Sequence, residues 1–203
     1  MLITANLIMF VIEWAMDLGP GNYWYGGTQS SEVLNGLGSL QNNLWQTRQF
    51  FRLLTASFLH YGYSHFLMNM LALSVVGPFV ERRLGTMIYA MIYIASGIAT
   101  MATLACLNRL KLIQIDSLVG ASASIMALAG ALVIIFYRNW KMIRTRSNLK
   151  LMRLVVAILL IQLAADYFTP VVSSVGHFSG MVWGAIFAAA LLKTKITSPP
   201  ASP

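Results

Sequence analysis

Charged side chains are scarce in this chain of 203 residues: 10% are Asp, Glu, Lys or Arg, while 58% are hydrophobic. A soluble globular domain averages about 25% charged residues, so this composition cannot cover a water-facing surface of the same size. The few charges are unevenly spread and leave long apolar runs between them. Since about 20 mostly apolar residues cross a bilayer as a helix, we expect one compact membrane domain with no soluble domain attached.

Cysteine, histidine and suitably placed acids are also too few for several kinds of site. The single cysteine, Cys106, excludes an intramolecular disulfide. Three histidines without a paired carboxylate make a poor zinc site, and the His-Glu-x-x-His motif of metalloproteases is absent. Asp17 and Asp166 lack the Gly-x-Gly-Asp context typical of intramembrane aspartyl proteases. We therefore expect no metal and no other cofactor.

A leader sequence and a nucleic-acid surface are likewise not indicated. The first apolar stretch carries Glu13 and Asp17, and no basic segment precedes it, so we interpret it as a retained span rather than a signal peptide. The net charge of +8 comes from basic residues between apolar spans. In that position they act as topology signals, and we expect no nucleic-acid partner.

The apolar runs predict an all-α membrane protein with six spans. These fall near residues 1–18, 64–80, 86–107, 119–137, 151–168 and 172–192. The polar segment 19–63 is rich in Tyr, Trp and Phe, which favour the membrane–water boundary, so we expect an ordered first loop that lies partly in the membrane. The alternative is a flexible exposed loop. Residues 1–192 are predicted to form a single domain, and 193–203, with three prolines, a disordered cytoplasmic tail.

The distribution of Lys and Arg predicts the orientation of the chain. If the N-terminus is cytoplasmic, ten of the fourteen basic residues lie on the cytoplasmic side and four lie outside. The four on the outer side are Arg48, Arg52, Arg109 and Lys111. Cytoplasmic segments carry the excess of Lys and Arg, so both termini are expected in the cytoplasm.

Polar groups inside spans are costly, which makes them candidates for function. In the predicted topology the second, fourth and sixth spans all enter from the outer side, and each begins with such groups. They are His65 and Asn69 in the second span, Gly120, Ser122 and Ser124 in the fourth, and Ser174, Gly176, His177, Ser179 and Gly180 in the sixth. The topology therefore brings these groups to a similar depth below the outer surface.

A serine and a histidine at one depth suit hydrolysis. A serine hydroxyl becomes a good nucleophile when a base such as His177 takes its proton. The oxyanion formed by attack on a carbonyl needs donors, and Ser122 is predicted at a helix N-terminus with free backbone N–H groups. His65 and Asn69, at i and i+4, share one helical face and can donate to the same point. His60 lies in the preceding loop and is expected to be structural.

Each residue also has a purely structural interpretation. Ser122 could bond the carbonyl one turn back, His177 could be a packing residue, and Asn69 could join two helices. We interpret Gly176, Gly180 and Gly184 as a small-residue face that brings the sixth span close to a partner helix, and the small residues of the fourth span make it a candidate for that partner. Asp166 could orient His177 in a triad, but we expect it to face the membrane interface instead.

Three ordered blocks and one turn resemble the rhomboid family of intramembrane serine proteases over residues 45–190. The blocks are the His-rich stretch from Phe58 to Met70, Gly120-Ala121-Ser122-Ala123, and His177 to Gly184, and the turn is Glu81 to Gly85. The resemblance implies a six-helix rhomboid-like bundle and a catalytic dyad of Ser122 and His177. It implies transmembrane protein substrates, cut near the outer face of the bilayer at small residues close to helix-weakening ones.

The chain departs from the family pattern at three places. Ala123 stands where a glycine usually follows the nucleophile, Met126 where an aromatic often packs on the base, and Phe51-Arg52 where a Trp-Arg pair is common. Two rivals remain: a catalytically silent rhomboid-like protein that binds membrane helices, and a small-solute transporter. The short chain favours a bacterial inner membrane. The physiological substrate and the oligomeric state stay open.

Overall fold

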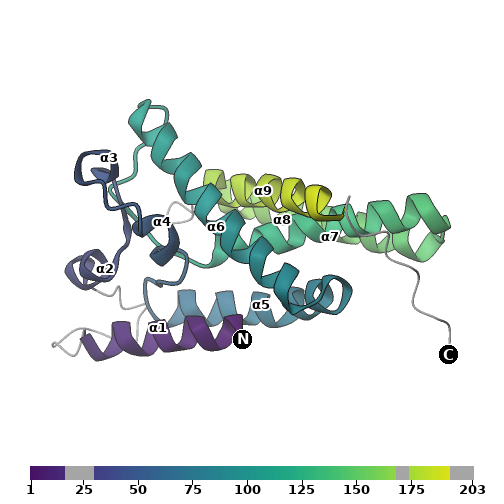
Figure 1. Ribbon diagram of the computed structural model, residues 1–203, viewed down its shortest axis with the longest axis horizontal. Helices are drawn as coiled ribbons and strands as arrows, with labels where there is room; N and C mark the ends of the chain where they lie inside the picture. Colours follow the sequence, from purple (N-terminus) through teal and green to yellow (C-terminus); the bar gives the residue numbers. More distant parts are fainter. Residues whose placement is uncertain (17–29, 168–173, 193–203) are drawn as a thin grey trace.

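A computed structural model describes residues 1–16, 30–167 and 174–192 of the chain as a helical bundle (Figure 1). Its long helices are α1 (Leu2–Met16), α5 (Tyr63–Leu84), α6 (Thr86–Arg109), α7 (Ser122–Ile143), α8 (Arg146–Tyr167) and α9 (Ser174–Leu192). The predicted tail, 193–203, lies outside the described residues. The helices from α5 to α9 correspond to the second to sixth predicted spans.

Among the residues that the structure describes, five helices, α5 to α9, are long and apolar enough to cross a membrane. Helix α1 is apolar but has 15 residues, fewer than the about 17–25 of a typical span. The prediction of a multi-helix membrane bundle is confirmed in this form, and a sixth crossing by α1 stays a prediction. Much of the apolar surface of α8 is exposed, for example at Leu160 and Ile161, as expected for a helix that faces lipid.

Helix α7 is the centre of the bundle, because it packs against α5, α6, α8 and α9. All residues from Ala123 to Leu132 are buried, and many of them are small. Small side chains allow neighbouring backbones to approach closely in a membrane bundle. The helix that begins with Ser122 is therefore held on several sides.

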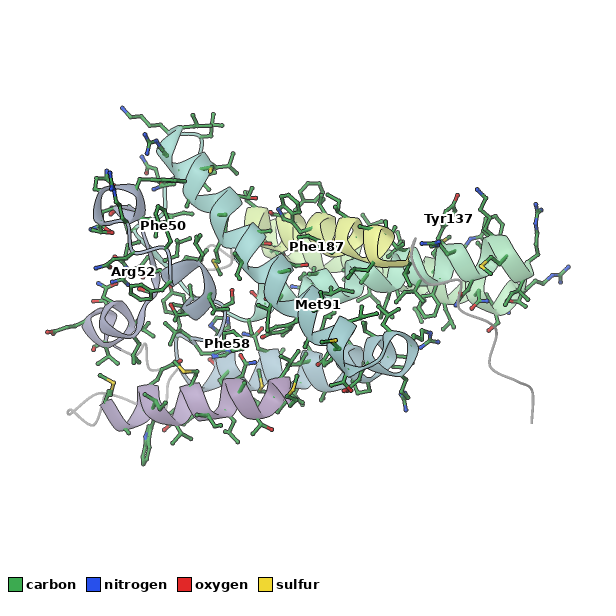
Figure 2. The ribbon with its side chains drawn as sticks, in the orientation of Figure 1. Phe50, Arg52, Phe58, Met91, Tyr137 and Phe187 are labelled. Carbon is green, nitrogen blue, oxygen red and sulfur yellow. The ribbon has the colours of Figure 1, made fainter. Side chains whose placement is uncertain are left out.

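The first loop is folded where the structure describes it, from residue 30 onward. It contains α2 (Ser31–Leu37), α3 (Leu44–Thr47) and α4 (Arg52–Thr55), and strand β1 (Leu40–Gln41) pairs antiparallel with β2 (Ser117–Leu118). Arg52 lies among these short helices (Figure 2), and its guanidinium donates to the carbonyl oxygens of Asn35 at 2.8 Å and Ser39 at 2.9 Å. From residue 30 onward the loop thus contains short helices and a strand, its place partly in the membrane stays a prediction, and the small β pair is a departure from an all-α fold.

The cytoplasmic turn expected between the fourth and fifth spans is much shorter than predicted. Helix α7 continues to Ile143 and α8 begins at Arg146, so the basic residues expected in a loop lie mostly on two helices. Arg and Lys are good helix formers, and their long side chains can reach water from a helix end. Arg144, with a φ of 54°, makes the reversal in the left-handed conformation.

Candidate active site

Ser122 is the first residue of α7, as the sequence predicted. Gly120, two residues earlier, has a φ of 142°, a conformation that side chains with a Cβ rarely adopt. A Cβ at Gly120 would lie 3.2 Å from His65 Nε2 and 3.5 Å from Ser122 Oγ. The Ser122 hydroxyl and the His65 ring therefore border one small space, next to the first turn of α7 with its free backbone N–H groups.

His65 and Asn69 lie one turn apart on α5, as their spacing predicted. His65 Nδ1 accepts a hydrogen bond from the backbone N–H of Tyr61 at 3.3 Å, which leaves Nε2 directed at the space beside Gly120. Asn69 is 6% exposed, and its Nδ2 has no hydrogen-bond partner among the described residues. The amide is a buried donor in need of an acceptor, because an unsatisfied buried donor is costly.

Close contact between α7 and α9 brings the His177 turn beside the Ser122 turn. A side chain at Gly180 would overlap the backbone of Ala123, and one at Gly184 would overlap the backbone of Ala127. At Gly180 and Gly184, the glycine face of the sixth span thus packs on the fourth span, its candidate partner. Ser122 and His177 do not share a hydrogen bond within the described part of the chain. Such bonds are often long without substrate and tighten when substrate binds.

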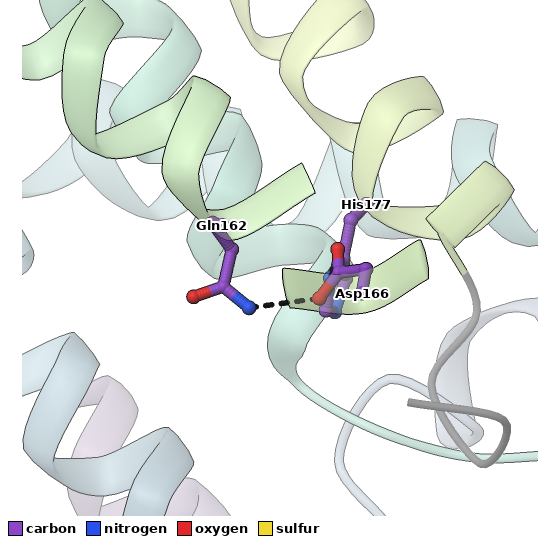
Figure 3. Close-up of polar contacts among 3 residues, drawn as sticks. All are labelled: Gln162, Asp166 and His177. Carbon is purple, nitrogen blue, oxygen red and sulfur yellow. Dashed lines mark hydrogen bonds and ion pairs between the residues drawn. The ribbon is translucent and has the colours of Figure 1, made fainter. Parts of the chain in front are cut away.

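His177 is held by a residue that we expected elsewhere. Its Nδ1 lies 2.6 Å from Asp166 Oδ2, and the two side chains come from the last turn of α8 and the first turn of α9 (Figure 3). Asp166 is 4% exposed, so the prediction that it faces the membrane interface is wrong. A carboxylate in an apolar bundle needs hydrogen-bond partners, and His177 supplies one.

Gln162 is the site residue that sequence reasoning missed. Its Nε2 donates to Asp166 Oδ1 at 2.8 Å (Figure 3). The available signal was the i, i+4 spacing of Gln162 and Asp166, which places two polar groups on one face of the apolar second half of the helix. Both carboxylate oxygens of Asp166 thus have partners.

His60 lies in the loop before α5, as predicted, and is completely buried. Its ring makes edge contacts with Phe10 of α1, with His65 and with Phe66. Its backbone N–H donates to the carboxylate of Glu13 at 3.2 Å, which gives the acid of α1 a buried partner. Burial, followed by the proximity of His65, lowers the pKa of His60 to about 3, so this ring is uncharged at neutral pH.

The remaining predicted position, Met126, packs in a cluster with Leu159 of α8. Within the described ranges, no group of three His, Cys, Asp or Glu side chains is placed to hold a metal ion. The polar candidates for a site are therefore Ser122, His65, Asn69, His177 and Asp166, which together offer a hydroxyl, ring nitrogens, an amide and a carboxylate.

Residues 47–194 match the family described as the Rhomboid domain. The chain belongs to the rhomboid family. The rhomboid protease GluP of Bacillus subtilis (strain 168) is 32% identical over 173 residues, which cover 82% of this chain and 31% of GluP. RHOMBOID-like protein 5 of Arabidopsis thaliana is 29% identical over 181 residues, covering 89% of this chain and 54% of that protein.

Not every relative of this rhomboid is named as a protease. Inactive RHOMBOID-like protein 8 of Arabidopsis thaliana is 26% identical over 120 residues, covering 59% of this chain and 33% of that protein. The chain thus spans only a third to a half of the length of these relatives. The family and the apolar helices show that the chain is an integral membrane protein. Whether it is active has to be argued from its own residues.

Proposed function

We propose that this rhomboid is an intramembrane serine endopeptidase with Ser122 as nucleophile and His177 as general base. The observation that carries the proposal is the contact of the Ala123 backbone with Gly180. Ser122 precedes Ala123 by one residue, and His177 precedes Gly180 by three, so both side chains start from adjoining helical turns. A serine and a histidine on adjoining turns form the minimal pair for acyl transfer.

The proposed reaction uses the His177 ring, the Asp166 carboxylate and the Ser122 hydroxyl. His177 Nδ1 is engaged with Asp166, which leaves Nε2 to accept the Ser122 proton while Oγ attacks the peptide carbonyl. The imidazolium then gives its proton to the leaving amine as the C–N bond breaks. Water hydrolyses the resulting ester of Ser122 by the same proton transfers in the reverse order, and no metal or other cofactor takes part.

Three sets of donors are available for the oxyanion. The backbone N–H groups of the first turn of α7 are free of helical partners, and the helix dipole makes that end positive. His65 Nε2 lies beside Gly120, and Asn69 supplies a buried amide on the same face of α5. Donors aimed at the developing negative charge are a major source of rate acceleration in acyl transfer.

The substrates in this proposal are transmembrane segments of other membrane proteins, cut near the outer face after local unwinding. Residues 1–192 act as one protease domain of six spans, with α1 as the first. Phe50 and Phe51 are 47% and 54% exposed, which suits a first loop that dips into the membrane boundary (Figure 2). The excess of basic residues supports an orientation with both termini in the cytoplasm, and we assign the protein to a bacterial inner membrane.

The proposed orientation has a direct test in the Cys106→Ser background. Lys111→Cys places a thiol on the proposed outer side, after α6, and Lys141→Cys places one on the cytoplasmic side, near the end of α7. A membrane-impermeant maleimide added to spheroplasts should label only the variant at position 111. Labelling only at 141 would reverse the topology.

The alternative is a catalytically silent rhomboid that binds membrane helices. One similar protein, from Arabidopsis, is named as inactive, which is the reason to test this alternative. A fluorophosphonate probe separates the two, because it reacts only with an activated serine. The folded wild-type protein should be labelled and Ser122→Ala should not. Ser74→Ala is the matched control: Ser74 is exposed on α5, its hydroxyl donates to the Leu71 carbonyl, and its loss should not affect labelling. Unlabelled wild-type protein, or labelled Ser122→Ala, would contradict the proposal.

A further inference from the structure

Asp166 has a hydrogen-bond partner for each of its carboxylate oxygens. Oδ2 lies 2.6 Å from His177 Nδ1, and Oδ1 accepts the Gln162 amide at 2.8 Å (Figure 3). The side chains of Asp166 and His177 are 1% and 10% exposed. Charge-assisted hydrogen bonds of this length are strong, and Gln162 fixes the plane of the carboxylate.

This arrangement bears on which nitrogen of His177 carries the proton. With Asp166 ionised, the carboxylate can only accept hydrogen bonds, which places the proton on Nδ1 and leaves the free lone pair on Nε2. That is the tautomer a base needs in order to take a proton from Ser122. When His177 becomes an imidazolium, the adjacent carboxylate also stabilises its positive charge.

We propose that Asp166 is a positioning residue that extends the pair of Ser122 and His177 to a triad. The proposal rests on the proposed function, and it goes beyond the dyad that the family resemblance implies. Asp166 acts through His177, because it sets the tautomer and the orientation of the His177 ring. Gln162 in turn orients the Asp166 carboxylate. The purely structural alternative is that the contact only ties the end of α8 to the start of α9.

Asp166→Asn separates these roles, because it keeps the shape of the side chain and removes its charge. In a serine protease triad, the corresponding change lowers kcat by about 10⁴-fold with the geometry intact. We expect kcat for a single-span substrate to fall by at least about tenfold, toward that value. KM should stay within about threefold, and the melting temperature close to that of the wild type.

Two further variants make the comparison specific. Asp166→Glu keeps a carboxylate, so its kcat should be higher than that of Asp166→Asn. If the contact only joined the end of α8 to the start of α9, the charge of the side chain would not affect kcat. Gln162→Ala is the matched control on the same helix face. It removes the second partner of Asp166 but leaves the Asp166–His177 contact, so its loss of kcat should be smaller than that of Asp166→Asn.

The proton itself can be located in wild-type protein, whether or not the variants fold. In ¹⁵N-histidine-labelled protein, the signals absent from His177→Gln belong to His177. They should show a proton on Nδ1 and none on Nε2. The opposite tautomer would overturn the triad.

The outcomes of the kinetic test distinguish the two proposals. A loss of kcat smaller than tenfold in folded Asp166→Asn, or a loss only in melting temperature, would overturn the positioning role. If Ser122→Ala is inactive in that same assay, the proposed function survives this result. If Ser122→Ala cleaves like the wild type, the proposed function and the triad fall together.

Discussion

The carbonyl oxygen of Ala123 in α7 occupies the place where a side chain at Gly180 in α9 would stand. The same relationship recurs one turn further along, between Ala127 and Gly184. Helices in a membrane approach this closely only where small residues leave room for the neighbouring backbone. The glycine face of α9 therefore sets the distance between the two helices that carry Ser122 and His177.

Gly184→Ala should destabilise the fold, because the added methyl group meets the Ala127 backbone rather than a movable side chain. Overpacking of this kind costs about 1–3 kcal/mol, and we expect a lower melting temperature in detergent. Gly36→Ala in α2 is the matched control, since a Cβ there meets no atom within 4 Å. Unchanged melting of Gly184→Ala would show that α7 and α9 are further apart than described.

Ala123→Gly should keep or raise activity. Ala123 is buried next to Ser122, the proposed nucleophile, where the family resemblance implies glycine, and removing its methyl group should give a substrate carbonyl more room. The measurement is kcat/KM of the variant against the wild type with one substrate. A large loss in a folded Ala123→Gly would mean that the methyl group shapes the pocket.

Much of this site could be predicted from the sequence, because its positions follow from motifs and spacing. Ser122 at a helix start, and His65 with Asn69 on one face, needed only the direction of three spans and the 3.6-residue period of a helix. The contact of Asp166 with His177 was missed because the spacing of Gln162 and Asp166 marks a polar face of α8 but does not fix the rotation that turns this face toward α9. That rotation depends on packing against the neighbouring helices.

The first loop was predicted less well, for a different physical reason. Helices as short as α3 and α4, with four residues each, are marginal on their own and have no periodicity to detect. They are held by tertiary contacts, such as those of Arg52 with the carbonyls of Asn35 and Ser39. The aromatic residues Tyr23, Trp24 and Tyr25, on which part of the loop prediction rested, lie outside the described residues.

Asn69→Ala should lower kcat by up to about 10²–10³, the typical cost of losing one oxyanion donor, since backbone donors at the start of α7 remain. His65→Ala should cost at least as much, because the ring also borders the space beside Gly120. Single-turnover kinetics of the folded variants give both values. If a folded variant with both Asn69→Ala and His65→Ala had the kcat of the wild type, the two residues would serve only as helix–helix contacts.

His60→Ala should lower stability more than chemistry. The ring is fully buried against Phe10 and Phe66, and truncating a large buried side chain to alanine costs about 2–5 kcal/mol. The measurement pairs the melting temperature with kcat at a temperature where the variant is folded. A large loss of kcat without loss of stability would place His60 in the chemistry.

The pH dependence of stability gives a second check on His60. Its folded-state pKa of about 3 lies below the ordinary value of 6.5, so the unfolded chain binds the proton more readily. The contribution of His60 is therefore present above pH 6.5 and is lost as the pH falls toward 3. His60→Ala should lose less stability than the wild type over this range. His65 and Glu13, the titratable groups that face His60, are present in both the wild type and the variant.

The most direct test of the central claim is cleavage of a single-span model substrate by purified protein in proteoliposomes. We predict that the wild type cleaves it, and that Ser122→Ala and His177→Ala abolish cleavage at a temperature at which both variants are folded. The double variant should be no worse than either single variant, because the two residues act as a unit. Clear turnover by folded Ser122→Ala would contradict the account.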